Sequence, residues 1–136
     1  MATRSIIKIN YGDTKLTLYR HHDGYLAVGG YDLACFLQTY PRASKLIKAM
    51  INRQRGIYIH DMETSLYSIE SCSNIGEEYT YIINFETETQ IKIEVLSYNE
   101  VIFLEYGNSE EVIKAFYKLC NDEQYRARNY QEVINQ

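Results

Sequence analysis

The chain of 136 residues has no tryptophan, only three cysteines and no long apolar run. No apolar stretch approaches the ~20 residues that a membrane-spanning helix needs, so we expect no transmembrane segment. The N-terminus leads into a strand pattern without the apolar run of a signal peptide, which predicts a cytosolic protein. Linkers, internal repeats and low-complexity segments are also missing. Residues 1–136 are therefore predicted to form a single domain.

The cysteines and the charge balance exclude further classes of protein. Cys35, Cys72 and Cys120 lie far apart, which argues against a disulfide framework and against a zinc site made of thiolates. We interpret Cys35 and Cys120 as reduced core residues, because both fall within apolar helical patterns. The formal net charge of −4 disfavours non-specific binding to long nucleic acid, although basic side chains can still gather locally.

Tyrosine is the residue in excess, with 14 Tyr against 4 Phe. A tyrosine ring offers a large, stiff contact area with a hydrogen-bonding tip, which suits interfaces and ligand pockets. The codon usage of an AT-rich genome is an alternative explanation of the same excess. The composition alone therefore leaves the use of these tyrosines open.

The hydrophobic pattern predicts an α+β fold. Alternation over residues 5–10 and 15–20, with a glycine turn between, indicates an N-terminal β-hairpin, and residues 25–28 are expected to be extended. Apolar positions at helical spacing then predict a helix capped by Asp32 and a second helix that Pro41 opens and Gly56 closes.

The second half of the chain reads as strands followed by one helix. Short connections between the strands, including residues 61–65, favour an antiparallel meander. The helix is expected to be capped by Asn108, with Glu111 as reciprocal partner, and to continue as a more polar tail. We expect a curved antiparallel sheet with the helix pair and the C-terminal helix on one face. The strands are predicted at residues 57–60, 66–70, 79–85, 90–96 and 101–106.

Titratable and aromatic side chains are densest from Tyr19 to Tyr25, where the sequence reads YRHHDGY. In the structural interpretation, Asp23-Gly24 forms a turn and Arg20 pairs with a carboxylate such as Glu77 or Glu78. The alternative is a metal-dependent hydrolase that uses His22 and Asp23 together with His60. Neighbouring residues of a strand point to opposite faces, so His21 and His22 cannot both join such a site. We therefore expect no metal.

The sequence offers little for catalysis. Glu77 and Glu78 diverge on a strand, which disfavours a shared-proton pair. Gly29-Gly30 precedes a helix as a phosphate-binding turn does, but Asp32 would repel an anion there. No serine, cysteine or lysine stands in an activating motif. We expect a protein that is not an enzyme and carries no cofactor.

Two groups of basic side chains are candidates for holding an anion. The first lies at the end of the second predicted helix, where guanidinium groups beside an aromatic ring can hold a phosphate and stack a base. The second lies on the C-terminal helix near Tyr125 and Tyr130, and an alternative use of it is to complete a partner's pocket across a dimer interface. A solvated helix face is the ordinary alternative for the first group. The candidate ligand-binding residues are Arg20, His22, Arg53, Arg55, Tyr58, Arg126 and Arg128.

Two motifs resemble those of a family of small phage and prophage proteins. The first is Arg-His-x-Asp-Gly-Tyr before a helix, present here from Arg20 to Tyr25, and the second is Gly-Glu-Glu-Tyr-x-Tyr, present from Gly76 to Tyr81. The resemblance covers roughly residues 15–105. The chain departs from it at Leu26, where the family has proline, and over residues 61–75. The resemblance implies an origin in a mobile genome and brings no catalytic residue.

Small non-enzymatic phage proteins of this kind often counter host defences, which gives two expectations of different classes. The first is a phage-encoded protein that acts in the cytosol of the infected host, where it binds a small nucleotide immune signal and sequesters it. The alternative is an inhibitor that binds a host defence effector, such as a CRISPR complex, through its tyrosine-rich strands and acidic loops. Because the meander leaves sheet edges and the C-terminal helix is amphipathic, we also expect a homo-oligomer.

Overall fold

The computed structural model describes residues 3–20, 22–52, 62–65 and 77–134. Two strands, β1 (Ser5–Tyr11) and β2 (Thr14–Arg20), are followed by one turn of π-helix, η1 (Leu26–Gly30). Two α-helices come next, α1 (Tyr31–Thr39) and α2 (Ala43–Asn52). The remaining elements are β3 (Met62–Ser65), β4 (Tyr79–Phe85), β5 (Gln90–Ser97), β6 (Glu100–Asn108) and α3 (Ser109–Ile134).

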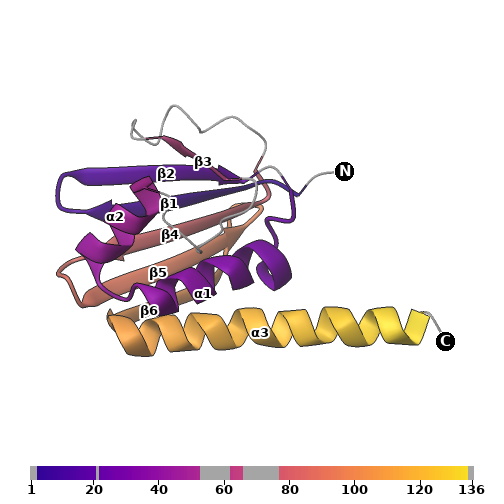
Figure 1. The fold of residues 1–136 in the computed structure, drawn as a ribbon. Coiled ribbons are helices and arrows are strands. Elements are labelled where there is room, and N and C mark those ends of the chain that lie inside the picture. Colours follow the sequence, from indigo (N-terminus) through magenta and orange to yellow (C-terminus); the bar gives the residue numbers. More distant parts are fainter. Residues whose placement is uncertain (1–2, 21, 53–61, 66–76, 135–136) are drawn as a thin grey trace.

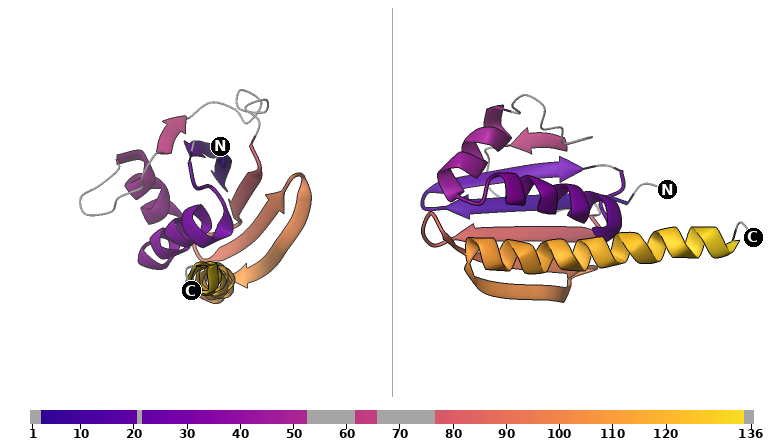
Figure 2. Two further views of the ribbon diagram at one scale, coloured as in Figure 1. Left: turned by 90° about the vertical axis from the view of Figure 1, so that its right-hand side faces the viewer. Right: turned by 60° about the horizontal axis from the view of Figure 1, so that its bottom comes forward.

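The strands form one mixed sheet in the order β3-β2-β1-β4-β5-β6. The sheet curves around the helices, which all lie on its concave side (Figures 1 and 2). The β1–β2 hairpin and the β4–β5–β6 meander are antiparallel, and β1 pairs with β4 in parallel. The predicted α+β class is confirmed, with one correction. The sheet is mixed because β4 starts at the end of the sheet at which β1 began, with Tyr79 opposite Ser5, so that β4 runs alongside β1 in the same direction.

Alternation along the strands builds the core that the pattern predicted. Leu16, Leu18 and Arg20 of β2 are all buried on the helix side, and Tyr81, Ile83 and Phe85 of β4 share that side. Burying such side chains against the helices stabilises the domain by ~25 cal/mol per Å² of apolar surface. The remaining large side chains of the core are Ile7, Ile9, Leu33, Phe36, Leu37, Leu46, Ile47, Met50, Ile91, Ile93, Val95, Val112, Ile113 and Phe116.

The C-terminal helix α3 begins as predicted. The side-chain oxygen of Asn108 accepts a hydrogen bond from the backbone N–H of Glu110 at 3.0 Å, which satisfies one free donor of the first turn. Phe116 packs on Phe103 and Tyr81, with ring centroids 5.7 and 6.1 Å away. The C-terminal part of the helix continues beyond the end of the sheet (Figure 1). Residues 122–134 therefore extend a helix whose first half is anchored in the core.

The structure corrects two local predictions at the entrance to α1. Residues 26–30 are not extended but form η1, in which the N–H groups of Val28 and Gly30 both donate to the carbonyl of Tyr25 at 3.2 Å. Glycine permits this close packing, because a Cβ on Gly29 would lie 2.8 Å from the Asp23 carbonyl oxygen. Asp32 is not the N-cap of α1, which is Gly30, but lies in its first turn.

The predicted strands at residues 57–60 and 66–70 lie outside the described residues. A strand not predicted, β3, occupies Met62–Ser65, where we expected a connection. It pairs antiparallel with Thr17–Arg20 of β2 at the edge of the sheet. Backbone pairing at an edge needs no buried face, so the hydrophobic pattern carried no signal for it.

Candidate functional site

The dense YRHHDGY turn is organised around Arg20. Its side chain is 2% exposed at the end of β2, and it contacts the Asp32 carboxylate with Nη1 at 2.8 Å. Its Nε donates to the backbone carbonyl of His22 at 2.7 Å. The predicted partners Glu77 and Glu78 are replaced by Asp32, because the first turn of α1 lies directly over the end of β2. Arg20 therefore holds the turn to the helix, which gives this candidate ligand residue a structural role.

Gly24 completes the same structural unit by close packing. A Cβ at this position would lie 2.6 Å from the Cβ of Ser5. The backbone N–H of Gly24 donates to Thr3 at 2.8 Å, and its carbonyl accepts from the buried Tyr81 hydroxyl at 2.7 Å. Asp23 has a positive φ of 57°, which a turn with aspartate tolerates. The turn thus connects the N-terminal strand, η1 and β4.

The structure describes some of the predicted ligand-binding residues and not others. Arg53, Arg55 and Tyr58 lie outside the described residues, as do His21 and His60. His22 is exposed at the turn. Arg128 belongs to α3, and its side chain lies outside the described part. Of the predicted arginines on α3, Arg126 is the one whose surroundings are described.

Arg126 lines a cleft of about 330 Å³ at the end of the sheet from which α3 projects. Tyr25 at the entrance to η1 and Tyr79 at the start of β4 give it aromatic surface, and Glu123 lies on the same helix as Arg126. The volume is within the ~300–1,000 Å³ typical of small-molecule sites. The full set of lining residues is Tyr25, Leu26, Ala27, Tyr79, Glu123, Arg126 and Ala127.

The cleft joins the two sequence motifs. Tyr25 ends the first motif and Tyr79 lies in the second, although 53 residues separate them. The Tyr79 ring lies nearly parallel to the Tyr81 ring, at an interplanar angle of 15°. Sequence reasoning proposed neither tyrosine as a site residue. The available signal was that each motif carries a tyrosine at or near its end.

The charged residues of the cleft form one ion pair that water can reach. Arg126 Nη1 lies 2.9 Å from the Glu123 carboxylate, and the two side chains are 75% and 35% exposed. Such exposed pairs exchange partners at little cost in free energy. Tyr98 lies close to Tyr79, and the negative charge of Glu78 raises the pKa of the Tyr98 hydroxyl above its usual value. The cleft therefore offers aromatic faces, one guanidinium and one carboxylate.

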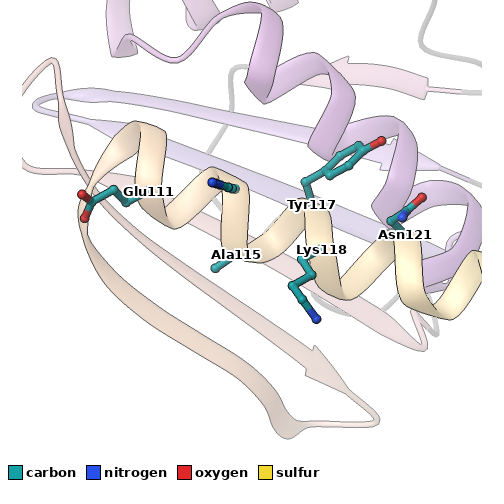
Figure 3. A pocket seen from close by; sticks show the side chains of 6 residues that line it. Glu111, Ala115, Tyr117, Lys118 and Asn121 are labelled. Carbon is teal, nitrogen blue, oxygen red and sulfur yellow. The ribbon is translucent and has the colours of Figure 1, made fainter.

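A second hollow, of about 430 Å³, runs along the exposed side of α3. Figure 3 shows side chains of this helix around it, among them Glu111, Tyr117 and Lys118. All of its lining residues belong to α3, and Lys118 is paired with Asp122 at 3.1 Å. Because no second element provides an opposing wall, we regard it as a helix surface and not as a ligand site.

Neither cysteine that the structure describes is activated as a nucleophile, and the described residues form no metal-binding cluster. Burial raises the pKa of the Cys120 thiol to about 12 and also raises the pKa of Cys35, so both thiols stay protonated at neutral pH. Within these residues, no three His, Cys, Asp or Glu side chains gather as a metal site. His60, which the metal interpretation requires, lies outside the described part.

Comparisons with protein-family models, with curated proteins and with solved structures found no match to this chain. Over the described residues, no helix is both long and apolar enough to span a membrane.

Proposed function

We propose that this protein is a non-enzymatic binding protein that captures a small nucleotide in the cleft between η1, β4 and α3. The observation that carries the proposal is the meeting of Tyr25, Tyr79 and Arg126 around one hollow. These three side chains come from distant parts of the chain, and Tyr25 and Tyr79 belong to the two motifs that resemble those of phage proteins. The resemblance supports the further proposal that the nucleotide is a host immune signal, sequestered in the cytosol of an infected cell.

The residues of the cleft suit a nucleotide in two ways. A tyrosine ring stacks on a base with ~1–3 kcal/mol, whatever the base. A guanidinium group donates paired, charge-assisted hydrogen bonds to a phosphate. The Glu123 carboxylate is available to accept a hydrogen bond from an exocyclic amine once Arg126 has turned to the phosphate. One described guanidinium and one carboxylate match a ligand with few phosphates better than a polyphosphate.

Isothermal titration calorimetry with defined nucleotides tests the proposal. The probes are AMP, GMP, 3′,5′-cyclic AMP and cyclic di-AMP, titrated into the intact protein. We expect saturable binding of at least one of them, weakened about tenfold or more by Arg126→Ala, since a charge-assisted hydrogen bond contributes ~1.5–3 kcal/mol.

Lys118→Ala is the matched control for this titration. Lys118 lies on the same helix, is 79% exposed and forms a similar ion pair, but does not line the cleft. We expect it to bind as the wild type does. Equal weakening by both substitutions would show a general charge effect and would contradict the site. Binding of none of the four nucleotides would contradict the proposed function and favour the inhibitor of a host protein.

A further inference from the structure

Exposed apolar side chains are concentrated on one strand, β6, and the turn before it. Val101, Ile102, Leu104 and Tyr106 are 54%, 43%, 52% and 59% exposed, and Tyr98 in the turn is 69% exposed. Among the described residues, only Tyr125 is a further large apolar side chain of this exposure. A concentration of exposed apolar side chains of this kind indicates an interaction site.

The backbone of β6 is open as well. The strand is last in the sheet order, so within the described residues it pairs with β5 alone. Its nine residues contain neither lysine nor proline, which commonly protect an edge strand from pairing with another chain. The strand is about 30 Å long at ~3.3 Å per residue, long enough for extended pairing.

The register with β5 assigns the β6 side chains to the two faces of the sheet. Phe103 and Glu105 lie opposite the buried Val95 and Ile93, so they face the helices, where Phe103 packs on Phe116. Leu104 therefore points to the other face of the sheet. Tyr106 lies two residues further along, on the same face as Leu104. Val101 and Ile102 lie at a bulge opposite Leu96.

We infer that β6 pairs with β6 of a second copy of this chain, antiparallel and about a two-fold axis at Leu104. This symmetry places Leu104 against its own copy and Tyr106 against Ile102, so that exposed apolar side chains meet. It also places Glu105 opposite Phe103 and Glu100 opposite Asn108. No carboxylate faces another carboxylate in this pairing.

The arrangement of charge and apolar side chains favours a second copy as the occupant. Pairing about Glu105 would put two carboxylates side by side, which is destabilising. Pairing about Leu104 matches the strand to itself in apolar character and in charge. The resulting sheet would run continuously through both copies, with the α3 helices on the same face. The inference is independent of the nucleotide proposal, because the β6 residues do not line the cleft.

Cysteine cross-linking locates the proposed axis. The parent variant for this experiment has no native cysteine, because Cys35 and Cys72 are changed to serine and Cys120 to alanine. In this parent variant, Leu104→Cys places two thiols on adjacent strands at the axis. The Cα atoms of directly opposite residues on antiparallel strands are ~4.5–5.5 Å apart, a distance that allows a disulfide. We expect a covalent dimer on mild oxidation, seen as a doubled mass on a non-reducing gel.

Val101→Cys in the same parent variant is the matched control. Val101 has nearly the same exposure as Leu104, but the two copies of residue 101 would lie six residues apart along the strands, ~20 Å, too far to link. Cross-linking at 101 and not at 104 would overturn the register. Equal cross-linking at both positions would show random collision and would overturn the proposal as well.

Light scattering after size-exclusion chromatography tests the dimer without cysteines. We expect the wild type to elute as a dimer and Leu104→Lys, which places two ammonium groups at the axis, to elute as a monomer. Far-UV circular dichroism of Leu104→Lys checks that the variant is folded. A wild type that is monomeric at ~100 μM would overturn the proposal, and capture of a host protein through β6 would then be the use of this surface.

Discussion

Two arginines of this protein each pair with one carboxylate at almost the same distance, and their surroundings differ. Arg20 lies 2.8 Å from Asp32 and is 2% exposed, whereas Arg126 lies 2.9 Å from Glu123 and is 75% exposed. Arg20 also donates to a backbone carbonyl, in a turn closed by glycine packing. Arg126 stands at the rim of a cleft with two tyrosines.

Burial, and not the presence of a partner, therefore separates an arginine with a structural role from one that is available to a ligand. A buried guanidinium that leaves its carboxylate would leave charges unpaired, which is costly. An exposed guanidinium exchanges its carboxylate for a ligand phosphate with little loss of free energy. Arg20, in the YRHHDGY motif, therefore stabilises the fold, whereas the exposed Arg126 is the candidate for binding.

Removing each arginine in turn should give the largest contrast. We expect Arg20→Met to lower the free energy of unfolding by about 3 kcal/mol, since it removes two charge-assisted hydrogen bonds of a buried guanidinium, one to the half-exposed Asp32 carboxylate and one to the carbonyl of His22. Arg126→Met should lower it by less than ~0.5 kcal/mol, as for exposed pairs. Urea unfolding followed by circular dichroism measures both. Equal losses of unfolding free energy in the two variants would show that burial does not distinguish the two arginines.

Gly24→Ala sharpens the structural side of the comparison. The added methyl group would overlap the Ser5 side chain, so we expect a loss of about 2 kcal/mol, as for overpacked sites. The double variant Ser5→Gly, Gly24→Ala removes the overlapping side-chain atoms and should recover part of that loss. If the loss of stability in the double variant equals or exceeds the sum of the losses in the two single variants, overlap with Ser5 is not the cause.

The smallest effect is expected at the contact between α1, which carries Asp32, and α3, which carries Arg126. The hydrogen bond to Tyr117 raises the pKa of Tyr31 from 10.0 to about 12. Below pH 10 this tyrosine is protonated in both folded and unfolded chains, so its contribution to stability is constant. Between pH 10 and 12 the unfolded chain ionises first, and stability falls.

Tyr31→Phe tests this assignment. We expect a shallower loss of stability between pH 10 and 12 in the variant than in the wild type, measured by urea unfolding at each pH. Tyr25→Phe serves as a control, because that residue lines the cleft and not the α1–α3 contact. Identical pH profiles of the wild type and Tyr31→Phe would show that this contact does not set the pH dependence.

Much of the fold was predictable because its signals are local. Alternation at Leu16 and Leu18 and the cap at Asn108 depend on neighbours in the sequence, and the structure confirms them. The π-helical turn and the parallel pairing of β1 with β4 were not predictable, because each depends on contacts between distant segments.

The candidate site was harder to predict than the fold. Arg126 was among the proposed residues, but Tyr25 and Tyr79 meet it only because η1 and the start of β4 lie beside the projecting helix. No spacing in the sequence encodes that meeting. The pairing of Arg20 with Asp32 was missed for a related reason. The prediction placed Asp32 at the cap of α1, whereas the structure turns its carboxylate back to the end of β2.

Native mass spectrometry of the wild type, mixed with the four nucleotides, tests the binding claim most directly. We expect an added mass of one nucleotide per chain, retained in Lys118→Ala and bound about tenfold or more weakly in Arg126→Ala. Such a result would assign binding to the exposed arginine and its cleft. A folded wild type that carries no added mass, or an Arg126→Ala variant that binds the nucleotide as tightly as the wild type, would contradict binding in this cleft.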